Sequence, residues 1–109
     1  MATAAKRVSE ALRQWADWDL VAPLARAPRL GPVLSEGSGH ILFELVDEPS
    51  LVARVRRRPT SGVEGAFSGE IEIWSAAAAA GIAPALVYVD HQQQAVICER
   101  ACQASHAIT

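Results

Sequence analysis

Apolar side chains recur at helical spacing near the N-terminus. Val8, Leu12 and Trp15 follow one another at four- and three-residue steps, which predicts an amphipathic helix. Thr3 and Ser9 are both residue types that cap helix N-termini, and the sequence leaves the choice between them open. We expect this helix to pack on the outside of the domain.

A second helix is predicted over Ser68–Ala80. Ser68 is a capping residue type, and Glu70 and Glu72 follow in the first turns, where the positive end of the helix dipole favours carboxylates. A run of alanines carries high helix propensity, and Gly81 ends the helix because glycine readily adopts left-handed backbone. Ile82 is expected to clasp this end. The apolar stripe of the helix is Phe67, Ile71, Trp74 and Ala78.

Elsewhere the apolar residues form short runs bounded by turn residues, which predicts strands. The segment 26–32 contains Pro28 and Pro32 and is expected to be an irregular connection. The predicted strands are Val33–Leu34, Ile41–Val46, Leu51–Arg56, Leu86–Val89 and Ala95–Glu99.

Alternation in the third strand places two sets of side chains on opposite faces. Leu51, Ala53 and Val55 form one face, and Val52, Arg54 and Arg56 form the other. The element order of helix, three strands, helix and two strands predicts an α+β fold. We expect one five-stranded antiparallel sheet, with the second helix packed on it.

Composition then excludes several classes. A chain of 109 residues that is 50% hydrophobic allows one globular domain. The net charge of −2 argues against electrostatic binding of nucleic acid. The basic run 54–58, taken alone, is interpreted as a solvated strand end. No apolar stretch reaches the ~20 residues that a membrane span needs.

The positions of the cysteines, histidines and acidic residues indicate the cellular compartment and argue against redox and metal sites. Cys98 and Cys102 lack the C-x-x-C spacing of a redox or zinc site, so we expect reduced thiols in a cytoplasmic protein. Acidic residues within the first thirty positions interrupt any signal-peptide core. The three histidines are scattered, and we predict no metal site.

Three features have the residue types of a phosphate site, and each has a plain structural explanation. Gly37 and Gly39 let backbone approach a phosphate, although a hairpin turn also uses such residues. Arg54 offers a fork of donors suited to phosphate oxygens, or is a solvated charge. Glu70 or Glu72 could pair with it, or could be explained by the helix dipole alone.

Taken in order, these features resemble a known family. Segments 34–40 (LSEGSGH), 51–55 (LVARV), 81–86 (GIAPAL) and 96–100 (VICER) resemble the small-molecule phosphotransferases: choline/ethanolamine kinase, thiamine kinase and the aminoglycoside phosphotransferases. The resemblance covers about residues 30–101. It implies a protein-kinase-like small lobe that binds ATP and Mg²⁺ and transfers a phosphoryl group to a hydroxyl of a small metabolite.

The resemblance also implies roles for individual residues. Gly37, Ser38 and Gly39 would cover the phosphates, Arg54 would contact them, and Glu70, with Glu72 as second choice, would orient Arg54. Val52 would lie near adenine. Backbone groups between Cys98 and Ala101, those of Glu99 and Ala101 among them, would form the hinge that hydrogen bonds adenine. These positions are Gly37, Ser38, Gly39, Val52, Arg54, Glu70, Glu99 and Ala101.

The sequence departs from the family pattern at two loop positions and in its length. Choline-kinase-like members usually carry a second glycine where Glu36 stands and asparagine where His40 stands, and a carboxylate at Glu36 repels phosphates unless it points away. No catalytic-loop motif H-x-D-x-x-x-x-N occurs before the chain ends. We therefore expect a truncated kinase, inactive alone, with a helical extension at 1–29, a small lobe at 30–101 and a hinge remnant at 102–109, whose metal ligands and acceptor site lie in a missing lobe.

A rival interpretation comes from another class. A free-standing α+β interaction module with no nucleotide site would use its three tryptophans for packing or for a partner surface. ATP-analogue binding to wild type and to an Arg54→Ala variant separates the two, because equal affinities favour the module.

Overall fold

The computed structural model describes residues 3–20, 24–37, 39–57 and 64–100 of the chain. For residues 64–66 only the backbone is described. The elements are α1 (Ala4–Leu12), the 3₁₀ turn η1 (Trp15–Asp17), β1 (Arg29–Glu36), β2 (His40–Val46), β3 (Leu51–Arg56), α2 (Glu64–Ala79), β4 (Leu86–Asp90) and β5 (Ala95–Glu99).

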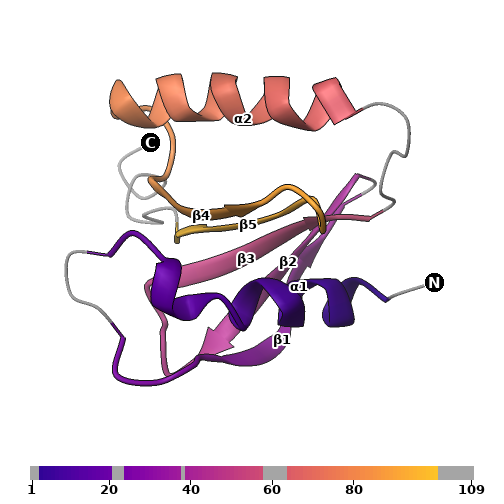
Figure 1. The fold of residues 1–109 in the computed structure, drawn as a ribbon, viewed down its shortest axis with the longest axis vertical. Coiled ribbons are helices and arrows are strands. Elements are labelled where there is room, and N and C mark those ends of the chain that lie inside the picture. Colours follow the sequence, from indigo (N-terminus) through magenta and orange to yellow (C-terminus); the bar gives the residue numbers. More distant parts are fainter. Residues whose placement is uncertain (1–2, 21–23, 38, 58–63, 101–109) are drawn as a thin grey trace.

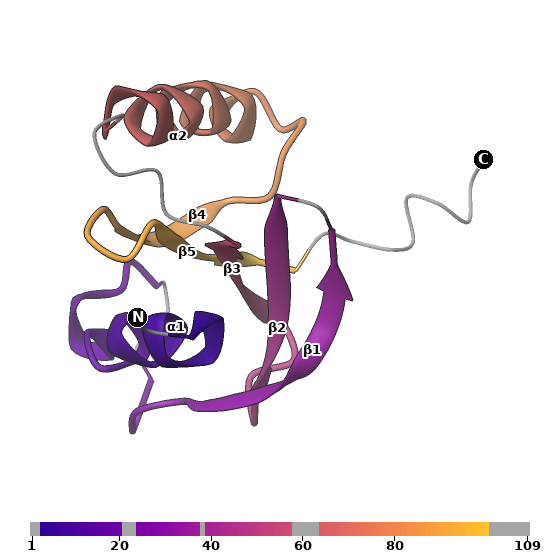
Figure 2. The ribbon, with the colours of Figure 1, turned by 90° about the vertical axis from the view of Figure 1, so that its right-hand side faces the viewer.

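The fold is α+β, with one five-stranded antiparallel sheet between two helices. The strand order is β1-β2-β3-β5-β4, and every neighbouring pair is antiparallel. Figure 1 shows α2 above the sheet and α1 below it, and the turned view of Figure 2 agrees. The expected sheet, and the packing of the two helices on it, are therefore confirmed.

The first helix is shorter than its periodicity predicts. The Thr3 side chain accepts a hydrogen bond from the backbone N–H of Lys6 at 3.1 Å, so Thr3 rather than Ser9 is the N-cap. The helix ends at Leu12, and the chain passes through η1 to the buried Trp18. Val8 and Leu12 pack into the same core as β2, β3 and β5, so one face of this outer helix is buried against the sheet.

The expectation of an irregular segment at 26–32 is wrong from Arg29 onward, because β1 begins there. The register of β1 against β2 shifts twice, between Leu30 and Val33 and between Val33 and Ser35. Such bulges let a strand contain proline and bend away from a flat sheet. Figure 2 shows β1 curving along the sheet edge.

The predicted alternation in β3 is confirmed and divides the interior into two cores. Leu51, Ala53 and Val55 belong to the core on the α1 side. Val52 lies on the other face, in a second core with Phe67 of α2 and Val96 of β5. Arg54 shares that second face, so its side chain is directed toward α2.

The second helix begins earlier and ends as expected. It starts at Glu64, so Ser68 is an exposed residue inside the helix and not its cap. At the other end Gly81 has φ of 80°, and the N–H of Ile82 donates to the carbonyl of Ala77 at 2.9 Å, which closes the last turn. The side chain of Ile82 is 80% exposed, so the predicted clasp is wrong.

Candidate functional site

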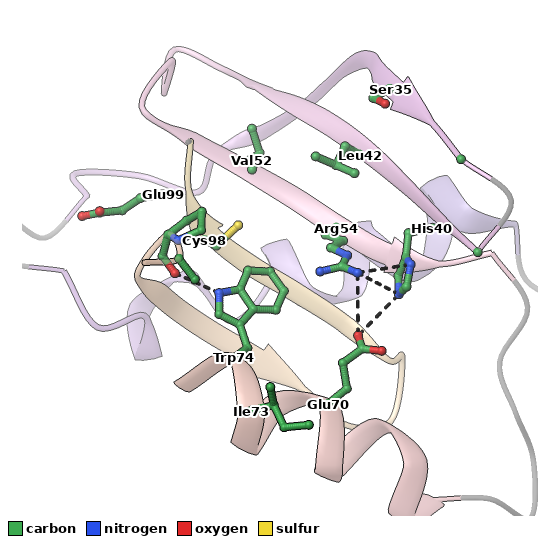
Figure 3. Close-up of a pocket in the computed structure, with 14 residues that line it drawn as sticks. Ser35, His40, Leu42, Val52, Arg54, Glu70, Ile73, Trp74, Cys98 and Glu99 are labelled. Carbon is green, nitrogen blue, oxygen red and sulfur yellow. Dashed lines mark hydrogen bonds and ion pairs between the residues drawn. The ribbon is translucent and has the colours of Figure 1, made fainter. Parts of the chain in front are cut away.

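A cleft of about 590 Å³ lies between α2 and the sheet face that carries Arg54. Its walls come from the β1–β2 hairpin, β3, the middle of α2, the segment after α2 and the end of β5 (Figure 3). The residues that line it are Ser35, Gly37, Gly39, His40, Leu42, Val52, Arg54, Glu70, Ile73, Trp74, Ala83, Pro84, Cys98 and Glu99.

Arg54 occupies the middle of this cleft. Its side chain is 30% exposed, and its Nη2 lies 3.9 Å from Oε1 of Glu70. The guanidinium also lies over the ring of Trp74, 5.0 Å from the ring centroid. Trp74 follows Glu70 by four residues, so both project from one side of α2. Glu72 is exposed and does not line the cleft, so Glu70 is the carboxylate that faces Arg54.

Glu70 is shared among three nitrogen-bearing side chains. Arg56 Nη2 donates to Glu70 Oε2 at 3.2 Å, and His40 Nε2 lies 3.4 Å from Glu70 Oε1. The Arg56 side chain is only 15% exposed, since it packs over the ring of Phe67. Arg56 itself does not line the cleft, but it partly neutralises Glu70, so Arg54 is the cation among the described lining residues that can meet an anionic ligand.

The imidazole of His40 bridges Arg54 and Glu70, as the dashed lines of Figure 3 show. Arg54 Nη2 lies 3.2 Å from Nδ1 of this ring. Burial, followed by the charges of Arg54 and Arg56, lowers the pKa of His40, while Glu70 opposes the shift. The imidazole is therefore neutral at neutral pH.

The glycine hairpin is held at the rim of the cleft by Arg57. The Arg57 side chain donates to the carbonyl of Gly37 at 3.0 Å, and its backbone N–H donates to the carbonyl of Gly39 at 2.9 Å. Glu36 pairs with the same guanidinium at 3.4 Å. Glu36 does not line the cleft, so its carboxylate is not placed to repel phosphates there.

Backbone bonds within the hairpin limit what it offers to a ligand. The N–H of Gly37 donates to the carbonyl of His40 at 2.9 Å, so this donor is engaged in the turn. Gly37 and Gly39 line the cleft, and their lack of a side chain keeps its rim open. Ser38, which was predicted with them, lies outside the described residues.

The cleft also has an apolar floor. Val52, Leu42 and Cys98 form it, and Val52 lies on the same face of β3 as Arg54, as predicted. The indole N–H of Trp74 donates to the carbonyl of Pro84 at 2.8 Å, which fixes the ring beside them. Burial raises the pKa of Cys98 to about 11, so its thiol stays protonated.

The expected hinge is only partly usable. The backbone N–H of Glu99 donates to the carbonyl of Ala85 at 3.0 Å, and that of Arg100 donates to Ser50 at 2.7 Å. These two donors are therefore not available to adenine, which corrects the prediction for them. Glu99 lines the cleft, but its carboxylate points away from it in Figure 3. Ala101 lies outside the described residues.

Sequence reasoning missed three residues of the site: His40, Arg56 and Trp74. The interpretation of the basic run as a solvated strand end is wrong for Arg54, which lines the cleft, and for Arg56, whose side chain is 15% exposed and pairs with Glu70. The alternation that assigns Arg54 to this face also assigns Arg56 to it. His40 pairs with Arg56 across β2 and β3, and that register became known only from the structure.

No family model, curated protein or solved structure matches the chain. Within the part of the chain that the structure describes, no helix combines the length and apolarity needed to cross a bilayer. Among the same residues, no group of three or more His, Cys, Asp or Glu side chains is placed to hold a metal ion.

Proposed function

We propose that this chain is the ATP-binding small lobe of an ATP-dependent phosphotransferase that acts on a hydroxyl of a small metabolite. Choline, ethanolamine, thiamine, an amino sugar and an aminoglycoside are the acceptors that the sequence resemblance suggests. The fold is proposed to be a protein-kinase-like small lobe, with β3 carrying the phosphate-binding cation and α2 carrying its carboxylate partner.

One observation carries the proposal. Arg54 lies in a cleft whose rim is the glycine hairpin and whose opposite wall places Glu70 at 3.9 Å. A solvated strand-end arginine needs neither neighbour. A nucleotide-phosphate site needs both, because the hairpin admits the phosphates and the carboxylate restrains the cation that binds them.

The size and polarity of the cleft fit a nucleotide. A volume of about 590 Å³ lies within the range of ~300–1,000 Å³ found for small-molecule sites. The apolar floor at Val52, Leu42 and Cys98 suits a base, and the guanidinium of Arg54 suits phosphates. Leu42 pairs with Arg54 across β2 and β3, so the apolar floor adjoins the cation.

In this proposal the chain's own residues bind and orient the nucleotide. Arg54 donates from its planar guanidinium to phosphate oxygens. Glu70 limits the positions that the guanidinium can adopt, which lowers the entropy lost on binding. Mg²⁺ would enter with the nucleotide and would supply charge neutralisation at its phosphates, since no group of three or more His, Cys, Asp or Glu among the described residues is placed to hold it. We assign no catalytic residue here, because the sequence lacks H-x-D-x-x-x-x-N.

The test measures binding of a non-hydrolysable ATP analogue to wild type, Arg54→Ala and Arg29→Ala. Arg29 is an exposed arginine of β1 that pairs with Asp47 at 3.1 Å, so its removal changes net charge equally without touching the cleft. We expect Arg54→Ala to weaken binding about tenfold or more, since a charged hydrogen bond contributes about 1.5–3 kcal/mol. Arg29→Ala should bind like wild type.

Two results would overturn the proposal. Equal affinities of wild type and Arg54→Ala would place the analogue elsewhere and favour the interaction module. Equal weakening by both substitutions would show that only net charge matters. Ligand-detected NMR at millimolar analogue extends the measurement to weak binding.

A further inference from the structure

His40 lines the cleft, and histidine is the residue type whose charge changes near neutral pH. It contacts both Arg54 and Glu70, yet the proposed function gives it no role. Its side chain is 26% exposed and lines the cleft beside Gly37 and Gly39. A ligand at the hairpin therefore meets its ring.

The contacts of His40 favour a neutral ring without a ligand. Arg54 Nη2 lies 3.2 Å from Nδ1 and 3.3 Å from Nε2, and Glu70 Oε1 lies 3.4 Å from Nε2. Because Arg54 can only donate, a neutral imidazole can accept from it through its unprotonated nitrogen, whereas a doubly protonated ring would direct an N–H at a guanidinium.

An anion in the cleft would reverse this arrangement. When Arg54 donates to phosphate oxygens, its N–H group leaves the imidazole, and the unprotonated ring nitrogen is then without a donor. A proton from solvent adds to that nitrogen, and the resulting imidazolium can donate to Glu70 and to the phosphate. The positive charge gained lies between two anionic groups, Glu70 and the ligand, which stabilise it.

Building on the proposed nucleotide site, we propose that His40 is a third phosphate ligand that takes up a proton when a polyphosphate binds, so that binding strengthens as the pH falls. Of the described side chains, the charged groups that face His40 are Arg54 and Arg56 of β3 and Glu70 of α2. In the free protein burial and the two arginines disfavour the imidazolium. Ligand charge offsets the arginines, and the coupling is reciprocal: the ligand favours the proton and the proton favours the ligand.

The direct test follows the imidazole resonances of wild type by NMR across pH, with and without saturating tripolyphosphate. The spectrum of His40→Asn identifies the His40 signal. We expect tripolyphosphate to move the midpoint of the His40 titration upward by about one pH unit or more. His91 is exposed and does not line the cleft, so it is the internal control, and its resonances should not respond to tripolyphosphate.

The second test compares affinities for tripolyphosphate and for ATP in wild type, His40→Asn and His91→Asn from about pH 8 to about pH 5.5. Titration of the ligand itself is common to all three proteins and cancels between them. Wild type and His91→Asn should gain about tenfold more affinity than His40→Asn over this range, because one unit of pKa change corresponds to tenfold in affinity.

The outcomes separate the inference from the function on which it rests. Parallel pH profiles for wild type and His40→Asn, or an unmoved His40 midpoint at saturation, overturn the inference while Arg54-dependent ATP binding still supports the nucleotide site. A His40-dependent profile with equal affinity for tripolyphosphate and ATP supports the inference and overturns the nucleotide assignment. Absence of Arg54-dependent binding of either ligand overturns both.

Discussion

Arg7 lies on the face of the sheet opposite the cleft, and its contribution to the free energy of unfolding can be measured. It projects from α1, is 4% exposed, and donates from its two terminal nitrogens to the backbone carbonyls of Arg56 and Gln93. Arg56 ends β3 and pairs with Glu70, and Gln93 lies in the turn between β4 and β5. One guanidinium therefore joins α1 to two segments on the α1 side of the sheet.

Arg7→Met keeps most of the apolar stem and removes both hydrogen bonds. Hydrogen bonds from a charged donor contribute about 1.5–3 kcal/mol each, so the two together contribute about 3–6 kcal/mol. Removing the buried charge also returns its desolvation cost, which the lowered pKa of Arg7 reflects. We expect a net loss of about 3 kcal/mol in the free energy of unfolding.

Urea unfolding followed by circular dichroism measures this loss. With a slope of about 1.5 kcal/mol per molar, the midpoint of Arg7→Met should fall by about 2 M with the slope unchanged. Lys6→Met removes the same charge from an exposed neighbour and should change stability by less than about 0.5 kcal/mol. A loss below about 1 kcal/mol for Arg7→Met, or equal losses for both variants, would refute the reasoning.

Two further predictions concern the hairpin and the cleft floor. A Cβ at Gly31 would lie 2.7 Å from the carbonyl oxygen of Glu44, whereas one at Gly39 would meet no atom within 4 Å. Gly31→Ala should therefore cost about 1–3 kcal/mol of stability and Gly39→Ala nothing measurable, and equal thermal midpoints would contradict this. In a Cys102→Ser variant Cys98 is the single thiol, and its pKa of about 11 against 9.0 lowers the thiolate fraction at neutral pH about a hundredfold. Iodoacetamide should alkylate Cys98 about a hundredfold more slowly in the native than in the urea-unfolded protein, and equal rates in the two states would contradict its burial. The free energy of unfolding should fall as the pH rises from about 9 through 11, because only the thiol of the unfolded protein ionises in that range.

Local rules predicted the elements and failed mainly at their ends. Apolar residues at three- and four-residue steps identified both helices, and short apolar runs bounded by turn residues identified all five strands. Both patterns arise because one face of each element is buried. The start of α2 was predicted at Ser68 because serine is a common N-cap residue, but the helix begins at Glu64 and Ser68 lies inside it. The irregular reading of 26–32 overlooked that two bulges allow β1 to continue through Pro32.

The choice of Glu70 over Glu72 was also accessible from the sequence, because helical spacing places Glu70 on the side of Phe67 and Trp74 and Glu72 on another. The alternation that places Arg54 on the helix-facing side of β3 places Arg56 there too. Arg56 was not predicted as a site residue because it belongs to a basic run that was interpreted as solvated. The side on which a residue lies in a helix or strand follows from local backbone geometry, so it can be predicted from the sequence.

The arrangement of charges within the cleft depended on tertiary structure. His40 and Arg54 are fourteen residues apart, and Glu70 is sixteen beyond Arg54. Their contacts depend on the β2–β3 register and on where α2 lies over the sheet. The sequence by itself determined the elements, the faces of β3 and the residue types available for an anion, because these follow from short-range periodicity. Only the folded chain decided that His40, Arg54 and Arg56 of the sheet meet Glu70 of α2, because packing brings together residues that no local rule relates.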